Sequence, residues 1–202
     1  MPSQNISFFT PFDFSASAIK NNIQVKPVSL ESFEPKITPQ HKEVGFTAKP
    51  GQIFIEREDG HIKYILAGVS NDFTYQDGGE VYQGLRAAIG EDFLKDTAFA
   101  FDDNEIEVRA LERLSVGWGW SAYRFDLYKQ EKAPAPLQLS LSEKTDEKRI
   151  KAFVESVCLT RDLVNIPAND MGPDELEDIA EIVAQRHKAS FEVIKDEDLI
   201  EQ

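Results

Sequence analysis

The sequence predicts an α/β fold in which a central sheet is flanked by helices. Two observations lead to this prediction. Patterns typical of strands and of helices alternate between residues 52 and 128, as they do in layered α/β domains. Residues 64–69, YILAGV, are almost continuously apolar, which is typical of a strand buried on both faces of a sheet.

The first quarter of the chain is poor in patterns of regular structure. Residues 1–50 hold six of the ten prolines, which disfavour helices and interior strands, so we expect extended or looping chain with one short strand at 23–25. A β-hairpin should follow, because Asp-Gly at 59–60 is a strong turn signal between two apolar runs. Its strands are expected at 53–56 and 61–69.

Three further elements are expected before residue 130. Gly78 and Gly79 should open a helix, because the apolar residues after them recur at helical spacing. A short apolar strand is expected at 97–101. A longer helix is expected over 105–128, although two glycines weaken its middle.

A proline-containing segment at 132–136, KAPAP, predicts a stiff linker and a domain boundary. We place an N-terminal α/β domain at residues 1–133 and a linker with a connecting helix at 134–166. The start of a second α/β domain is expected at 167–202. A short strand should follow the linker at 137–141.

The last third of the chain predicts helix, break, helix. An apolar stripe at helical spacing indicates a helix at 145–164, which should end before Pro167 because residues preceding proline avoid the helical region. Pro173 sits well as the first residue of the next helix. A strand at 190–194 and a helix from Asp196 are expected to follow. The sequence thus ends within a βαβ-type unit that has been started and not finished.

Composition excludes several classes of protein. The formal net charge of −14 argues against nucleic acid and against anionic membrane surfaces as partners. No apolar run is long enough to span a bilayer, and no signal-peptide pattern opens the sequence. The single cysteine, Cys158, excludes an internal disulfide and fits a reducing compartment. We therefore expect a cytoplasmic protein.

Few side chains suggest chemistry. Cys158 falls on the apolar stripe of its helix, so a core thiol is the simpler interpretation and a nucleophile the weaker one. The three histidines, His41, His61 and His187, are scattered and show no metal-ligand spacing. The acidic runs at 175–178 and 196–198 are typical of solvated helix surfaces and helix starts.

Two segments have a functional and a structural interpretation. Gly78 and Gly79 could present backbone N–H groups to an anion, but without a phosphate-binding motif a structural turn is favoured. The aromatic segment at 118–125 could be a ligand shelf, a subunit contact or core packing, and packing is favoured. We assign no catalytic, cofactor-binding or metal-binding residue to this chain.

Two motifs resemble a known family. Residues 160–169, TRDLVNIPAN, followed by Gly-Pro and an acidic helix, are similar to the start of the catalytic domain in the leucyl (cytosol) aminopeptidase family. Residues 122–128, AYRFDLY, resemble that family's Tyr-x-Phe-Asp segment at the end of its small N-terminal domain. The resemblance covers residues 117–183 well and 52–202 loosely.

The resemblance implies a macro-domain-like N-terminal domain, a linker helix and the truncated start of a metallopeptidase domain. It implies a parent hydrolase that removes N-terminal amino acids such as leucine from peptides. The family binds two divalent metal ions, Zn or Mn, through a Lys-containing segment and an Asn-Thr-Asp-Ala-Glu-Gly-Arg segment. Neither segment occurs here, so no family catalytic residue can be transferred, and this chain alone should be inactive.

The resemblance also implies a homo-hexamer for the full-length protein, with the N-terminal domains projecting outward. We expect this chain alone to be a monomer or weak dimer, with the apolar faces of the helices at 145–164 and 173–188 exposed. A rival hypothesis rests on the macro-like fold. In it the chain is a binding module for ADP-ribose or another nucleotide, with Gly78 and Gly79 near the phosphates.

Overall fold

The computed structural model describes residue 14 and residues 21–89, 97–129 and 135–195. The chain divides into two compact units, one comprising residues 9–158 and the other containing residues 159–202. The boundary between the two units, after Cys158, falls within helix α5 (Glu147–Asn165). No helix in the described part of the chain is long and apolar enough to cross a membrane.

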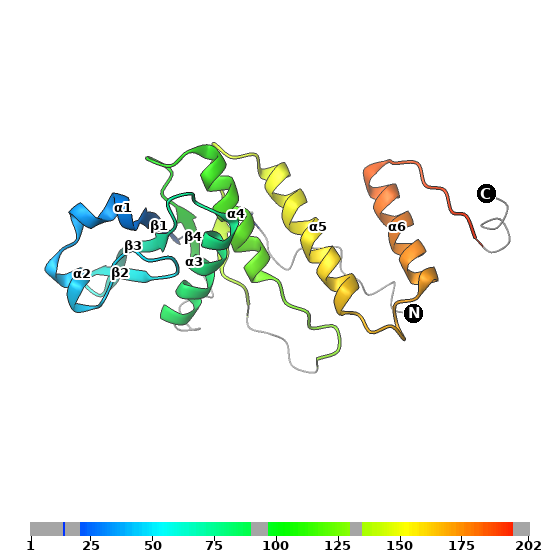
Figure 1. Ribbon diagram of the computed structural model, residues 1–202, viewed down its shortest axis with the longest axis horizontal. Coiled ribbons are helices and arrows are strands. Elements are labelled where there is room, and N and C mark those ends of the chain that lie inside the picture. The colour runs from blue at the N-terminus through cyan, green and yellow to red at the C-terminus, as the bar shows by residue number, and fades with distance from the viewer. Residues whose placement is uncertain (1–13, 15–20, 90–96, 130–134, 196–202) are drawn as a thin grey trace. The chain divides into compact units, whose positions relative to one another are not determined.

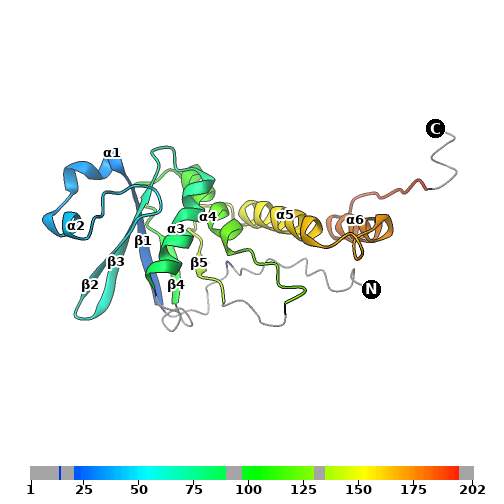
Figure 2. The ribbon, with the colours of Figure 1, turned by 60° about the horizontal axis from the view of Figure 1, so that its bottom comes forward.

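A five-stranded sheet forms the centre of the first unit, with the strand order β2-β3-β1-β4-β5 (Figure 2). β1 lies in the middle and runs parallel to both neighbours, β3 and β4. β5 is parallel to β4, whereas β2 forms an antiparallel hairpin with β3. The strands are β1 (Asn21–Ser29), β2 (Ile53–Glu58), β3 (His61–Val69), β4 (Thr97–Phe101) and β5 (Gln138–Ser140).

Helices cover both faces of this sheet (Figure 1), which confirms the predicted architecture. On one face α3 (Tyr75–Ala88) and α4 (Val108–Ala122) enclose the main core. Its largest fully buried side chains include Trp118, Tyr82, Phe99, Ile65 and Leu114. On the other face α1 (Leu30–Phe33) and α2 (Pro39–Glu43) accompany a smaller core of Val28, Phe33, Phe46, Ala48, Phe54 and Leu66.

The strand expected at 23–25 is present but longer than predicted, because β1 is a nine-residue central strand. Residues 1–13 and 15–20 lie outside the described residues. Pro27 lies inside β1 without losing a ladder hydrogen bond. The Val25 carbonyl accepts from the Asp102 N–H at 2.8 Å, so peptide groups of odd-numbered residues face β4. β4 has already ended at Phe101, which pairs with Val25, and no strand meets the missing N–H of Pro27.

Two other prolines in this region begin helical turns instead of interrupting them. Pro35 lies in the first turn of the 3₁₀ helix η2 (Glu34–Lys36), and Pro39 opens α2. A helix's first turn has no partner for those N–H groups, so proline costs nothing there. The Thr38 hydroxyl caps α2 by accepting from the His41 N–H at 3.3 Å.

Helices α3 and α4 differ from their predicted bounds. α3 begins at Tyr75, not at Gly78, because Thr74 caps it and forms a capping box with Asp77. α4 ends at Ala122, not near residue 128. Arg124 closes its end by donating to the carbonyls of Ser121 and Tyr123, at 3.1 and 2.7 Å.

The hairpin and the strands β4 and β5 agree with the predictions from the sequence. Asp59 and Gly60 both have positive φ, 51° and 81°, as the predicted tight turn requires. The strand predicted at 137–141 is β5, and it pairs with β4. The sheet therefore continues past residue 133, where we placed the end of the first domain. Residues 132–134 of the expected linker lie outside the described residues.

The second unit contains the end of α5 and α6 (Pro173–His187). The predicted helices at 145–164 and from Pro173 are confirmed. Residues 190–194, all of them described, form no strand, which corrects that prediction. A strand needs a neighbour for its peptide groups, and an apolar run alone does not supply one. The helix predicted from Asp196 lies outside the described residues.

Candidate functional site

The topology of the sheet creates a crevice at the carboxyl end of β1. The chain leaves β1 toward α1 on one face, whereas it leaves β3 and β4 toward α3 and α4 on the opposite face. Open α/β sheets bind ligands at such switch points. A hollow of about 700 Å³ lies there, within the usual range for small-molecule sites.

The walls of this crevice are largely aromatic and aliphatic. The lining side chains from β1, β3 and α1 include Val28, Leu66 and Phe33, which belong to the smaller core. His41 lines the crevice and is buried, with its ring 5.1 Å from Phe33. Its Nδ1 accepts from the Thr38 N–H at 3.0 Å. These contacts fix the imidazole as part of the wall.

Polar groups converge on the same hollow. The carbonyl of Pro27 faces the side where β4 has ended, so it lacks a neighbouring strand. Lys26 Nζ lies 3.8 Å from Glu105 Oε2, and Asp102 accepts from the Asn104 side-chain amide at 2.6 Å. Lys36 has no ion pair among the described residues. The crevice can therefore hold a small organic molecule with an apolar, planar portion and polar ends.

Asp77 connects the end of β3 to the start of α3 and is buried. Its carboxylate accepts from the N–H and the hydroxyl of Ser70 at 2.7 and 2.6 Å, and from those of Thr74 at 2.6 and 2.7 Å. Burial opposes ionisation of Asp77, but these four hydrogen bonds outweigh it and hold its pKa below the ordinary value. Asp77 therefore acts as a charged anchor for this corner of the fold.

Gly78 and Gly79 form neither the turn nor the anion site that the sequence suggested. Both lie inside α3, where it packs against α4. A Cβ on Gly78 would lie 2.0 Å from the Leu114 carbonyl oxygen, and one on Gly79 would lie 2.6 Å from the Ser121 hydroxyl oxygen. The glycines allow two helices to approach closely, so they present no N–H groups to a ligand.

The other candidate residues are not brought together. Cys158 is buried in the main core, as predicted. His61 is exposed at the start of β3, and His187 is exposed at the end of α6. In the described part of the chain no three His, Cys, Asp or Glu side chains group so as to hold a metal ion. The described residues therefore do not fit a two-metal site.

The aromatic segment is mainly packing. Trp118 is fully buried, and its Nε1 donates to the Leu137 carbonyl at 3.2 Å. Trp120 is partly exposed and stacks on Tyr75, with ring centroids 5.1 Å apart. The rings of Phe125 and Tyr128 form a tilted pair beyond the end of α4, with their centroids 5.9 Å apart.

Sequence reasoning missed the crevice because, apart from a short strand at 23–25, it treated residues 21–43 as irregular. It also missed Asp77, although the spacing Thr74-x-x-Asp77 is a capping signature that could have placed the start of α3. Nothing local in the sequence shows that Lys26, Lys36 and Asp102 line one hollow, because the pairing of β1 with β4 and the placement of η2 bring them there.

The sequence matches no family model. It is 27% identical over 173 residues to a probable cytosol aminopeptidase of Wolinella succinogenes, covering 79% of this chain and 35% of that protein. It is 34% identical over 92 residues to a probable cytosol aminopeptidase of Allorhizobium ampelinum, covering 39% of this chain and 18% of that one. The chain thus spans about a third of the first relative and less of the second.

Solved structures agree with these sequence matches. The cytosol aminopeptidase of Coxiella burnetii matches with a TM-score of 0.69 and 26% identity, over 89% of this chain and 39% of that one. The bottromycin maturation enzyme BotP, in complex with Mn, matches in fold with a TM-score of 0.61 and 20% identity, over 89% of this chain and 39% of its own. The N-terminal part of these enzymes therefore has the fold of this chain.

Proposed function

We propose that this chain is the non-catalytic N-terminal portion of a metal-dependent aminopeptidase. The premise is its similarity to the N-terminal part of the cytosol aminopeptidases. The observation that carries the proposal is coverage. The chain aligns over most of its own length but spans little more than a third of the Wolinella and Coxiella proteins. The catalytic groups of the parent enzyme would lie in the part that has no counterpart here.

The parent enzyme would be a cytoplasmic hydrolase that removes N-terminal amino acids from peptides. Two divalent ions, Zn or Mn, would be bound outside this chain, polarising the scissile carbonyl and activating a water molecule. One structural neighbour, BotP, is in complex with Mn, which supports metal use among proteins of this fold. Within this chain no residue is assigned to the metals or to the peptide.

The role of this chain would be in assembly and in controlling access to the active sites of a homo-hexamer. Apolar side chains at its helical end support a role in contacts. Val164 in α5 is 78% exposed and Leu176 in α6 is 48% exposed, although both are apolar. Such side chains are typical of surfaces that another domain or subunit covers.

We expect no aminopeptidase activity from the 202-residue chain. Incubated with leucine p-nitroanilide and Mn²⁺ or Zn²⁺, it should release no more nitroaniline than a protein-free blank. A longer polypeptide from the same reading frame, containing both metal-binding segments, should be active. Turnover by the 202-residue chain would overturn its non-catalytic role. Inactivity of the longer polypeptide with either metal would overturn the aminopeptidase assignment.

The same preparations test assembly by light scattering at micromolar concentration. The 202-residue chain should be a monomer or weak dimer, and the longer polypeptide should be a hexamer. A stable hexamer of the shorter chain would show that its own surfaces are sufficient for assembly.

The crevice favours a second candidate function, the binding of a nucleotide or ADP-ribose. Its place at the switch point and its volume suit a ligand of that size. Its charges suit a nucleotide less well, because Asp102 and Glu105 offset Lys26 and Lys36. The phosphates would depend on Lys36, which has no ion pair among the described residues.

Isothermal titration calorimetry with ADP-ribose tests this second function. If the crevice binds ADP-ribose, the affinity should be micromolar. Lys36→Gln should lower that affinity about tenfold, the size expected for the loss of one charge-assisted contact. Lys42→Gln is the matched control, because Lys42 is exposed on α2 and does not line the crevice. Absence of heat with ADP-ribose, or equal losses in the two variants, would eliminate this candidate.

A further inference from the structure

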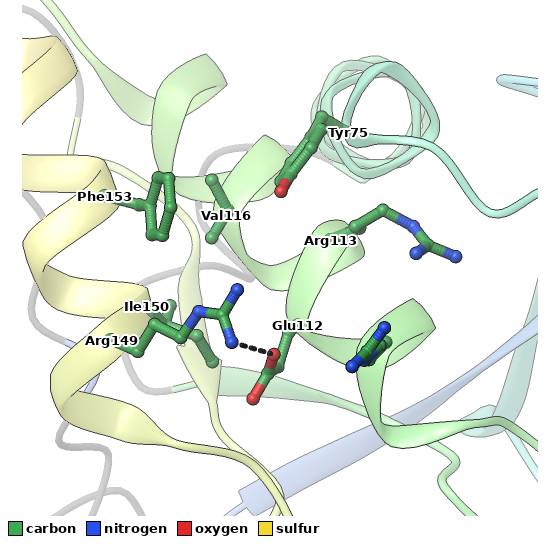
Figure 3. Close-up of a pocket in the computed structure, with 8 residues that line it drawn as sticks. Tyr75, Glu112, Arg113, Val116, Arg149, Ile150 and Phe153 are labelled. Carbon is green, nitrogen blue, oxygen red and sulfur yellow. Dashed lines mark ion pairs between the residues drawn. The ribbon is translucent and has the colours of Figure 1, made fainter.

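A second hollow, the arginine pocket, shares no lining residue with the crevice. Figure 3 shows its lining side chains. The arginine pocket has a volume of about 300 Å³ and is formed where the start of α3, the N-terminal half of α4 and the first turns of α5 come together. Its lining residues are Tyr75, Arg109, Glu112, Arg113, Val116, Arg149, Ile150 and Phe153.

The arginine pocket is cationic in an acidic protein. Arg109, Arg113 and Arg149 supply three positive charges against the single carboxylate of Glu112. The formal charge of the lining is thus +2, whereas the whole chain carries −14. Such a local reversal of charge concentrates anions at one place on the surface.

The three guanidinium groups are held differently. Arg113 donates from Nε to the Phe73 carbonyl at 2.7 Å and from Nη2 to the Asp72 carbonyl at 2.9 Å. These acceptors are neutral, so they fix the side chain without cancelling its charge. Arg109 is exposed, and its side chain makes no hydrogen bond or ion pair with any described residue. It is therefore available to an anion.

Arg149 is only loosely paired. Its Nη1 lies 4.0 Å from Glu112 Oε2, at the outer limit for an ion pair, and Figure 3 shows the two groups facing each other across the pocket. The other oxygen of Glu112 accepts from the Asp146 N–H at 3.2 Å. Glu112 is mostly buried and so remains in place, whereas Arg149 also lies over the Phe153 ring, with its Cζ 5.8 Å from the ring centroid.

The remaining walls of the arginine pocket are apolar. Val116 lies between the rings of Tyr75 and Phe153, which are 38% and 43% exposed (Figure 3). Ile150 also lines the pocket, and both aliphatic side chains are buried. Tyr75 is held by stacking on Trp120, whose Nε1 donates to the Phe153 carbonyl at 3.4 Å. An exposed ring fixed as Tyr75 is offers contact area at a low cost in conformational entropy.

We propose that the arginine pocket binds an organic carboxylate that carries an aromatic or aliphatic group. The planar carboxylate matches the forked donors of Arg109 and Arg149. Arg113, whose guanidinium is turned toward the Asp72 and Phe73 carbonyls, adds only its charge nearby. The apolar group lies over Val116, between the two rings. The volume suits a ligand of about one residue rather than a nucleotide.

Two sources share this chemistry, the C-terminal residue of a peptide and a free aromatic or aliphatic acid. Glu112 discriminates between them. Its carboxylate faces the pocket and can accept from the N–H of a terminal peptide bond, a donor that a free acid lacks. The proposal concerns binding to this chain alone, so its outcome is independent of the aminopeptidase assay.

NMR titration of the ¹⁵N-labelled 202-residue chain tests the proposal with N-acetyl-L-phenylalanine. Binding is expected with a Kd on the order of 1 mM, as suits so small a ligand. N-acetyl-L-phenylalaninamide, which lacks the charge, should bind about tenfold more weakly. Inorganic phosphate, which lacks the apolar group, should also bind more weakly. Tighter binding of N-acetyl-L-phenylalanine than of 3-phenylpropionate identifies a peptide end, and equal binding identifies a free acid.

Arg109→Gln should weaken binding of N-acetyl-L-phenylalanine about tenfold without affecting the fold, because the Arg109 side chain has no partner among the described residues. Arg57→Gln is the matched control, since Arg57 is exposed on β2 and outside the arginine pocket. Phe153→Ala should weaken binding of N-acetyl-L-phenylalanine but not binding of phosphate. Any of three results would overturn the proposal. They are an amide that binds as tightly as the acid, phosphate that binds as tightly as the acid, and equal losses of affinity in Arg109→Gln and Arg57→Gln.

Discussion

Replacing Gly117 by alanine should lower the free energy of unfolding by about 3 kcal/mol or more, although alanine is ordinarily the better helix former by about 1 kcal/mol. A Cβ at this position would lie 1.8 Å from the carbonyl oxygen of Tyr75 and 3.2 Å from the N of Gly79. Both atoms belong to the backbone of α3, so no side-chain rotation relieves the clash. The helices α3 and α4 must separate, and the core between them loosens.

Urea denaturation followed by tryptophan fluorescence measures this effect, because Trp118 is buried in the affected core. Gly79→Ala is the matched control in the same helix pair. Its Cβ would lie 2.6 Å from the Ser121 hydroxyl oxygen, which belongs to a side chain that can move. We expect a smaller loss for Gly79→Ala, and relief of that loss in the Ser121→Ala background. A neutral or stabilising Gly117→Ala would show that the two helices do not approach this closely.

Asp77→Asn should cost about 2 kcal/mol at pH 7, the usual size for hydrogen bonds to a buried charged group. Asparagine has one side-chain acceptor oxygen where Asp77 uses two, and its amide N–H group would face donors from Ser70 and Thr74. The loss should appear as a lower urea midpoint. Asp72→Asn is the control, because Asp72 is exposed and its side chain makes no hydrogen bond with a described residue.

The cost of Asp77→Asn should also depend on pH. The pKa of Asp77 is lower in the folded protein than in the unfolded chain, where it is about 4. Its stabilisation is therefore fully present above pH 4 and is lost as the pH falls through 4 toward the folded pKa. The difference between wild type and Asp77→Asn should shrink between pH 5 and pH 3. A difference independent of pH would mean that the charge of Asp77 contributes nothing to folding.

Local patterns were sufficient for several elements. The Asp59-Gly60 turn, the strand β3 and the strand β4 have the expected bounds, because turn chemistry and continuous apolar runs are properties of a few neighbouring residues. The helix α5 was equally predictable, since its apolar stripe indicates both the helix and its buried face.

The sites were much less predictable than the elements. Arg109 and Arg113 are four residues apart, a spacing that places them on one helix face, but Arg149 comes from another helix altogether. The crevice combines β1, α1 and the chain after β4, which are separated by about seventy residues. Only the packing of these elements creates either hollow.

The sequence by itself determined the α/β class, the hairpin, the helices α5 and α6 and the resemblance to the cytosol aminopeptidases, because each depends on residues close together in the chain. Tertiary structure alone decided that residues 21–29 form the central strand, that Pro27 is tolerated there, and that Gly78 and Gly117 serve helix contact. It also decided that residues 190–194 form no strand. The physical reason is the same in each case: strand pairing and close helix contact depend on a partner segment, and the sequence of one segment does not specify its partner.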